Sequence, residues 1–287
     1  MTDRSEQSRA AVIGAGTMGN GIAHVFAQHG FRVVLTDVSG EVLERALAAI
    51  RTSMQRQIKR GTLDEAGRDA ALARIETATD LSAVAGAEIV VEAVPEVVDL
   101  KIETLKALDE VTPPTAILAT NTSSISITRL AAQTDRPDRV VGMHFMNPVP
   151  VMELVEVIRG LATSDETVDQ VTQLARDLGK TPVVVKDSPG FVSNRVLAPM
   201  LNEAVYCLYE GIATPEAIDQ VMKLGMNHPI GPLALADLIG LDTCLSVLEV
   251  LHRDLGDDKY RPCPLLKQYV AAGWLGRKTA RGFYVYE

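Results

Sequence analysis

The sequence has few cysteines and no long apolar run, and each absence excludes a class of protein. Its 287 residues include three cysteines, Cys207, Cys244 and Cys263, which cannot all pair within one chain. Their spacing fits no zinc site, so we expect no metal and thiols kept reduced in the cytoplasm. No apolar stretch reaches the roughly 18 residues of a membrane-spanning helix. The first ten residues are mostly polar and lack the apolar stretch of a signal peptide.

Basic residues are fewer than acidic ones. The chain has 28 Lys and Arg against 37 Asp and Glu, which gives a net charge of -9 at pH 7. Such a chain is a poor partner for nucleic acid or an anionic membrane surface, so we expect neither. The hydrophobic fraction of 47% excludes global disorder and provides for a sizeable core.

Short apolar runs alternate with helical patterns over the first part of the chain, which is typical of a parallel sheet covered on both faces. The expected strands are 10–13, 32–36, 88–94, 115–120, 140–145, 152–158 and 182–185. A helix is expected over 18–28. Two more, over 41–60 and 64–75, break the alternation and predict a helical hairpin inserted into the sheet domain.

The strand pattern stops near residue 187, and the remainder predicts helices only. We expect helices from Ser188-Pro189-Gly190 to about Glu210, after Thr214-Pro215, over 233–251 and near 264–272. The chain should therefore form two domains, residues 1–187 and residues 188–287.

A glycine-rich loop, Gly14-Ala15-Gly16-Thr17-Met18-Gly19, follows the first expected strand and opens a helix. In this context the G-x-G-x-x-G motif indicates dinucleotide binding. Gly14 permits the tight turn, Gly16 lets a pyrophosphate approach the backbone, and Gly19 lets the helix pack against the strand. Asp37 ends the second strand, where its carboxylate would bind ribose hydroxyls and repel a 2′-phosphate. The sequence therefore favours NAD, with NADP left possible.

His144 and Glu156 are the candidates for proton transfer. His144 lies at the end of an expected strand, where open α/β sheets bind ligands, and imidazole exchanges protons near neutral pH. Glu156 stands among apolar residues, where a carboxylate needs a partner. If the chain doubles back at residues 147–150, the two side chains become neighbours and could form a dyad that activates a hydroxyl. A core histidine and a strand-edge glutamate are the alternative.

Two polar patches could complete such a site. Ser123, in Asn121-Thr122-Ser123-Ser124, directly follows an expected strand, and Asn194 lies one turn into the helix after residue 187. Their hydroxyl and amide groups could bind a substrate oxygen. From the residues alone, both patches could equally be turn and capping residues.

Several longer motifs occur together and in order. They are V-E-A at 91–93, N-T-S-S at 121–124, H-F-M-N-P-V-P-V-M-E-L-V-E-V from His144, D-S-P-G-F-V-S-N-R from Asp187 and R-K-T-A-R-G-F-Y from Arg277. With these and the glycine loop, the chain resembles the short-chain L-3-hydroxyacyl-CoA dehydrogenases from about Arg9 to Tyr286. Among them it looks most like the bacterial 3-hydroxybutyryl-CoA dehydrogenases.

The resemblance implies an NAD-dependent oxidoreductase of fatty acid metabolism, as in β-oxidation, with an acyl-CoA substrate. It implies that His144 is the catalytic base, that Glu156 is its partner, and that Ser123 and Asn194 contact the substrate. The implied NAD contacts are Asp37, Glu96, Lys101, Asn147 and Lys278. The implied coenzyme A contacts on the hairpin are Ser53 and a cation at Lys59 or Arg60, although a solvated helix face also explains such cations.

The resemblance further implies a homodimer formed through the helical domain. One departure is visible, because Ala280 stands where the family tail usually has glycine before G-F-Y. A methyl group there matters only if the position needs a positive φ.

Pattern and resemblance together predict an α/β fold: a Rossmann-type, doubly wound, mostly parallel sheet with an inserted helical hairpin, followed by an all-α C-terminal domain. Two other functions stay open. One is an NAD-dependent dehydrogenase of a free hydroxy acid, of the L-gulonate type, which needs no coenzyme A groove. The other is a non-catalytic NAD-binding protein.

Overall fold

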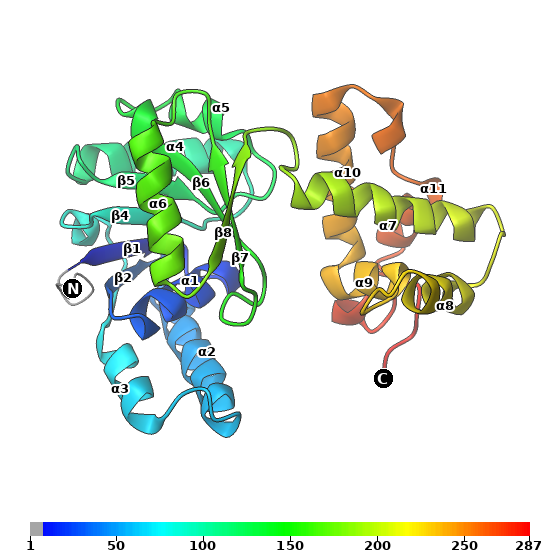
Figure 1. Ribbon diagram of the computed structural model, residues 1–287, viewed down its shortest axis with the longest axis horizontal. Helices are drawn as coiled ribbons and strands as arrows, with labels where there is room; N and C mark the ends of the chain where they lie inside the picture. Colours follow the sequence, from blue (N-terminus) through cyan, green and yellow to red (C-terminus); the bar gives the residue numbers. More distant parts are fainter. Residues whose placement is uncertain (1–7) are drawn as a thin grey trace. The chain divides into compact units, whose positions relative to one another are not determined.

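The computed structural model describes residues 8–287, which divide into two compact units at Asp187. In the first unit, eight strands within the described range form one sheet in the order β3-β2-β1-β4-β5-β6-β7-β8 (Figure 1). They are β1 (Arg9–Ile13), β2 (Arg32–Thr36), β3 (Ile75–Ala78), β4 (Ile89–Glu92), β5 (Ile117–Thr120), β6 (Val140–Phe145), β7 (Leu154–Arg159) and β8 (Thr181–Lys186). The expectation about a signal peptide falls largely on residues 1–7, which lie outside the described range.

The sheet is mostly parallel, as predicted. β1 to β6 all run in one direction, while β7 is antiparallel to β6 and parallel to β8. The central strands are apolar without alternation because helices cover both faces. One face carries α1 (Thr17–Gln28) and α6 (Asp165–Asp177), and the other carries α4 (Val98–Val111) and α5 (Ile127–Ala131) (Figure 1).

The inserted hairpin consists of α2 (Gly40–Lys59) and α3 (Glu65–Ala73), and it projects from the sheet (Figure 1). The predicted end of its second helix was wrong. The helix stops at Ala73, and Ile75–Ala78 forms the edge strand β3 beside β2. These four residues have partly or fully exposed side chains and give no recognisable strand pattern, and the predicted helix ended on the first of them, Ile75.

The second unit is helical, with α7 (Ser193–Tyr209), α8 (Pro215–Gly225), α9 (Pro232–Ile239), α10 (Leu241–Leu255) and α11 (Pro264–Ala271) around a core of its own. The single helix predicted over 233–251 was wrong. Gly240 has φ +105°, which is incompatible with a continuous helix, and it separates α9 from α10. Hydrophobic periodicity cannot detect this break, because the buried positions continue at a spacing of three or four residues from α9 into α10. No helix in the described part of the chain has the length and apolar character needed to span a bilayer.

The C-terminal tail packs onto α9 through one buried carboxylate. Asp237 accepts hydrogen bonds from the backbone N–H groups of Phe283 and Tyr284, each at 3.0 Å, and from the Tyr286 hydroxyl at 2.9 Å. Within this tail Ala280 has φ +55°. The position at which the resemblance leads us to expect glycine therefore does adopt the left-handed conformation that glycine favours.

Candidate active site

The parallel strands bring several candidate residues of the first unit to one edge of the sheet. The glycine loop follows β1, Asp37 follows β2, and His144 is the penultimate residue of β6. Glu96 follows β4, and Ser123 follows β5. After β3 the chain returns to place β4 on the other side of β1, so the strand order reverses between β1 and β4. Open α/β sheets bind ligands at such a reversal, outside the carboxyl ends of the strands.

The three glycines of the loop have different surroundings. Gly14 has φ +92°, and a Cβ there would lie 2.7 Å from the Ala93 carbonyl oxygen. A Cβ on Gly19 would lie 1.7 Å from the Gly14 carbonyl oxygen. Both positions therefore need glycine for the backbone to pack, whether or not a ligand is bound. A Cβ on Gly16, in contrast, would meet nothing within 4 Å, so the space beside this backbone is open to a ligand.

The helix that follows the loop offers its first amides to that space. Gly16 is the N-cap of α1, no side chain caps this end, and its first turn has no acidic residue. The starts of α3 and α6 differ, because Asp64 and Ser164 cap them and acidic residues follow. An uncapped helix start with its positive dipole end suits a pyrophosphate. The loop therefore fits a dinucleotide.

Asp37 is fixed against this loop. Its Oδ2 accepts a hydrogen bond from the Ala15 N–H at 2.8 Å, and its Oδ1 accepts one from the Ser39 N–H at 3.3 Å. The carboxylate is thereby held at the end of β2. An acceptor of this kind fits a ribose diol and would repel a 2′-phosphate.

His144 and Glu156 face each other across the antiparallel pair β6 and β7. They are register partners, and His144 Nδ1 lies 2.8 Å from Glu156 Oε2. Both are buried, with 7% and 2% of their surface exposed. An ionised carboxylate only accepts hydrogen bonds, so Nδ1 carries the proton and the lone pair of the neutral ring is on Nε2. The carboxylate orients the ring and stabilises its charged form, as a proton-transfer pair requires.

The reversal between these strands is held by contacts that the sequence did not reveal. Lys180 Nζ donates hydrogen bonds to the carbonyl oxygens of Val149, at 2.6 Å, and Met152, at 2.8 Å. Gly21 of α1 packs against Val149, since a Cβ there would lie 2.9 Å from that side chain. The reversal that aligns His144 with Glu156 is therefore held by packing against α1 and by hydrogen bonds from Lys180, the residue before β8.

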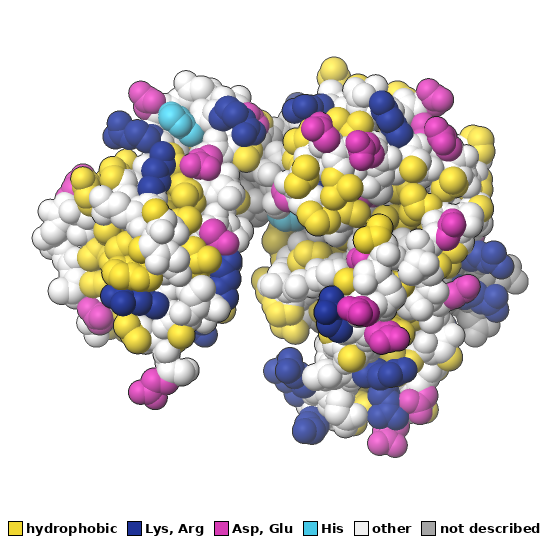
Figure 2. All heavy atoms as spheres, turned by 180° about the vertical axis from the view of Figure 1, so that it is seen from behind, with side chains coloured by type: hydrophobic (Ala, Val, Ile, Leu, Met, Phe, Trp, Pro, Cys, Tyr) yellow, Lys and Arg dark blue, Asp and Glu magenta, His cyan; other side chains and the backbone are white. Residues whose placement is uncertain are grey.

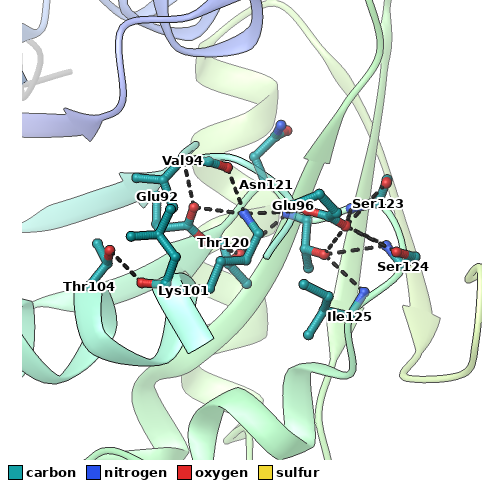
Figure 3. Close-up of polar contacts among 12 residues, drawn as sticks. Glu92, Val94, Glu96, Lys101, Thr104, Thr120, Asn121, Ser123, Ser124 and Ile125 are labelled. Carbon is teal, nitrogen blue, oxygen red and sulfur yellow. Dashed lines mark hydrogen bonds and ion pairs between the residues drawn. The ribbon is translucent and has the colours of Figure 1, made fainter. Parts of the chain in front are cut away.

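The loop that carries Ser123 is organised by Glu96 (Figure 3). Glu96 Oε1 accepts hydrogen bonds from the Thr122 hydroxyl at 2.5 Å and from the Ser123 N–H at 2.9 Å. The Ser123 hydroxyl at 3.2 Å and the Ser124 N–H and hydroxyl at 3.1 Å contact the same oxygen. Burial raises the pKa of Glu96, but the Lys101 charge and the bonds from this loop outweigh it, so the pKa lies below its usual value.

Lys101 and Glu92 form a buried ion pair close to this loop. The sequence patterns assign no role to Glu92 beyond its place in the V-E-A motif. Lys101 Nζ lies 2.7 Å from Glu92 Oε1, and the two side chains are 1% and 0% exposed. Glu92 Oε2 accepts a hydrogen bond from the Thr120 hydroxyl at 2.6 Å. The available signal was a charged residue that ends the apolar strand Ile89–Glu92, but its partner could not be identified without the fold.

The other candidate residues are more dispersed. Asn147 is exposed on the reversal after β6, and Ser53 is half-buried on α2. Lys59 and Arg60 are exposed at the end of α2, and Figure 2 shows Lys and Arg side chains gathered over the outer part of the hairpin. The remaining two belong to the second unit.

Both residues in that unit have partners there. Asn194 is in the first turn of α7, where its N–H donates to the Gly190 carbonyl oxygen at 3.1 Å. Lys278 Nζ contacts the two carboxylate oxygens of Asp242 at 2.5 and 2.6 Å.

A dinucleotide loop and a buried His–carboxylate pair on the carboxyl edge of one sheet define the class of nicotinamide-dependent dehydrogenases. Residues 9–188 match the family model described as "3-hydroxyacyl-CoA dehydrogenase, NAD binding domain", and residues 190–286 match "3-hydroxyacyl-CoA dehydrogenase, C-terminal domain". The chain belongs to the 3-hydroxyacyl-CoA dehydrogenase family. This confirms the resemblance and the expectation of NAD as cofactor.

Relatives match the chain over nearly its whole length. It is 58% identical to the probable 3-hydroxybutyryl-CoA dehydrogenase of Bacillus subtilis over 98% of each chain. It is 55% identical to the 3-hydroxybutyryl-CoA dehydrogenase of Bradyrhizobium diazoefficiens, over 97% of this chain and 95% of that one. The crystal structure of (S)-3-hydroxybutyryl-CoA dehydrogenase PaaH1 from Ralstonia eutropha superposes with a TM-score of 0.94 at 55% identity, covering 97% of this chain and 99% of that chain.

Proposed function

We propose that this protein interconverts (S)-3-hydroxyacyl-CoA and 3-oxoacyl-CoA with NAD as coenzyme, and that 3-hydroxybutyryl-CoA is its main substrate. The observation that carries the proposal is the 2.8 Å contact between His144 Nδ1 and Glu156 Oε2. It prepares one imidazole for proton exchange at the same sheet edge as the dinucleotide loop. The names and high identity of the relatives support the choice of substrate.

The chemistry assigned to the chain is a proton transfer coupled to hydride transfer. In the oxidative direction His144 Nε2 takes the proton of the C3 hydroxyl while the C3–H bond breaks to leave a carbonyl. The nicotinamide of bound NAD supplies the acceptor for the hydride. Glu156 stabilises the imidazolium that forms. In the reductive direction the imidazolium returns its proton to the carbonyl oxygen of the 3-oxoacyl-CoA.

Two further side chains are assigned to the substrate by resemblance. Ser123 and Asn194 would donate hydrogen bonds to the reacting oxygen, where negative charge develops in the reductive direction. Glu96 accepts hydrogen bonds from both the N–H and the hydroxyl of Ser123, which fixes the position of that residue. Because a hydroxyl has one proton to donate, the Ser123 O–H would have to turn from Glu96 to the substrate oxygen when substrate binds. Ser53 and the exposed cation at Lys59 or Arg60 are assigned to coenzyme A, whose phosphates are anionic.

The two units are assigned different tasks. Residues 1–187 would bind NAD, and residues 188–287 would contribute to substrate binding and form a homodimer. Exposed apolar side chains of the second unit support the dimer, since water contact is unfavourable for such a set. They include Ile212, Val221, Leu224, Met226 and Leu238. The three unpaired thiols support a reducing compartment, and we assign the cytoplasm.

A steady-state assay of acetoacetyl-CoA reduction tests this function. NADH and NADPH would be compared side by side, with free acetoacetate and L-gulonate-type acids as alternative substrates. We expect turnover of the thioester with NADH well above that with NADPH. Equal preference for free acids would replace the thioester assignment, and NAD binding without turnover of any of them would favour a non-catalytic protein.

A further inference from the structure

Two carboxylates share one buried ammonium group at the end of β4 (Figure 3). Lys101 Nζ lies 2.7 Å from Glu92 Oε1 and 3.4 Å from Glu96 Oε2. It also donates a hydrogen bond to the Val94 carbonyl oxygen at 3.1 Å. Two of the three donors of the ammonium group are therefore used by Glu92 and Val94, and Glu96 is held by charge at the longer distance. The shorter of the two carboxylate contacts is to Glu92, whose side chain is fully buried and therefore out of reach of a ligand.

Other hydrogen bonds fix the Glu92 carboxylate in place. Its Oε1 accepts a second hydrogen bond, from the Val94 N–H at 2.7 Å, and its Oε2 accepts the Thr120 hydroxyl at 2.6 Å. The Thr120 oxygen in turn accepts the Thr122 N–H at 3.3 Å. Glu92 therefore reaches the Ser123 loop by two routes, through Lys101 to Glu96 and through Thr120 to the start of the loop.

The two oxygens of Glu96 are used differently. Oε1 accepts the donors of residues 122–124, whereas Oε2 contacts Lys101 at the longer distance of 3.4 Å. The Glu96 side chain is 37% exposed, so a ligand can reach it, while Lys101 is 1% exposed. If Lys101 moved closer to Glu96, that carboxylate would be drawn from the loop and from any ligand.

We propose that Glu92 is a positioning residue for coenzyme and substrate: by binding the Lys101 ammonium group, it keeps Lys101 from closing on Glu96. Glu96 can then hold the Ser123 loop with Oε1 and accept a hydrogen bond from a bound ligand with Oε2. The loop is also tied to the strand of the candidate base, because Asn121 Oδ1 accepts the Phe145 N–H at 2.9 Å. The proposal rests on the proposed function in assigning ligand contacts to Glu96 and Ser123.

A purely structural role is the competing explanation, because buried ion pairs occur without any function. The chain supplies a matched control on the same helix as Lys101. Asp109 of α4 pairs with Arg136 at 2.5 Å, and the two side chains are 10% and 9% exposed. Asp109→Asn weakens a buried pair away from the Ser123 loop, so it should lower thermal stability without changing ligand binding.

The test begins with the protein free of acyl-CoA. In Glu92→Gln we expect the dissociation constant of NADH, measured by fluorescence, to rise about tenfold, the effect of weakening one charged hydrogen bond. Amide hydrogen exchange at Ser123, Ser124 and Ile125 should become faster, since their N–H groups bond to Glu96 and Thr122. Asp109→Asn should change neither quantity. Thr120→Val removes the hydroxyl that donates to Glu92 and accepts the Thr122 N–H. It leaves the Lys101 ion pair in place, so it should give a smaller change in the same direction, and it serves if Glu92→Gln does not fold.

A double-mutant cycle tests the route through Lys101. If Glu92 acts mainly through this residue, adding Glu92→Gln to Lys101→Met should weaken NADH binding by no more than Thr120→Val does alone, which is the share of the route through Thr120. Additive losses, or Glu92→Gln with wild-type NADH affinity and wild-type exchange in the loop, would overturn the proposal. His144→Gln, assayed in parallel for turnover, separates the two ideas. If it kept full activity, the proposed function would fail, whereas the NADH and exchange results would still decide the role of Glu92.

Discussion

Three carboxylates organise this site, two buried and one exposed, and each depends on a different kind of partner. Glu156 has an imidazole, Glu92 has an ammonium group, and Glu96 has a set of hydroxyl and amide donors. The pairing of His144 with Glu156 could be anticipated from the sequence, because a proline-containing turn lies between two apolar strands and brings its flanks together. The pairing of Glu92 with Lys101 could not, because it joins the end of a strand to a helix whose orientation the sequence does not specify.

Glu156→Gln tests the first of these carboxylates. The amide keeps the size of the side chain but carries no charge to stabilise an imidazolium, so kcat should fall by roughly 10²–10⁴, the range for a general acid–base component. The KM for NADH should change little. Steady-state acetoacetyl-CoA reduction measures both. Glu153→Gln, at an exposed position on the same reversal, is the control and should keep wild-type kcat. Wild-type turnover in Glu156→Gln would remove the proton-transfer pair.

At the scale of elements, the sequence predicted best the strands whose apolar runs have clear ends. The strands β1, β2 and β6 have continuous apolar runs that end at turn residues, and their predicted ranges are correct within one residue. The edge strand β3 was missed because its side chains are partly exposed. The break at Gly240 was missed because hydrophobic periodicity does not register a single change of φ within an apolar run.

The tail offers a prediction at this scale. Ala280 has φ +55°, a conformation that strains alanine by about 1 kcal/mol relative to glycine. Ala280→Gly should therefore raise the free energy of unfolding by up to about 1 kcal/mol, as measured by urea denaturation. Ala272→Gly is the matched control, since Ala272 is exposed at a helix end with φ -79°, where glycine only adds freedom to the unfolded chain. A loss of stability in both variants would show that Ala280 is not strained.

At the scale of the whole molecule, double winding explains how distant residues come to one edge. The sequence predicted the parallel sheet from its alternating elements, and from that the placing of the glycine loop, Asp37, Ser123 and His144 follows. It could not predict the charge balance of the buried residues behind this edge, which depends on side-chain distances. The net charge of -9 likewise gave no information on the proposed coenzyme A contacts, because the cations of the hairpin are gathered in one place on an acidic chain.

Overall stability should depend on pH through one buried histidine that the proposed chemistry does not use. His24 of α1 is 1% exposed, and its Nε2 lies 3.0 Å from Gln28 Oε1. Burial lowers the pKa of His24 from 6.5 to about 4. Between these values the unfolded chain binds a proton that the folded protein does not, so stability decreases as the pH falls through this range.

From pH 7 to pH 5 this one group should remove about 2 kcal/mol from the free energy of unfolding. His24→Leu should abolish that part of the decrease, because leucine does not titrate and suits a buried position. Urea denaturation of both proteins at the two pH values gives the difference directly. His252→Leu, at a side chain that is 38% exposed, is the control and should retain the wild-type decrease. If His24→Leu lost as much stability as the wild type over this range, the acid sensitivity of the fold would have to arise from other groups.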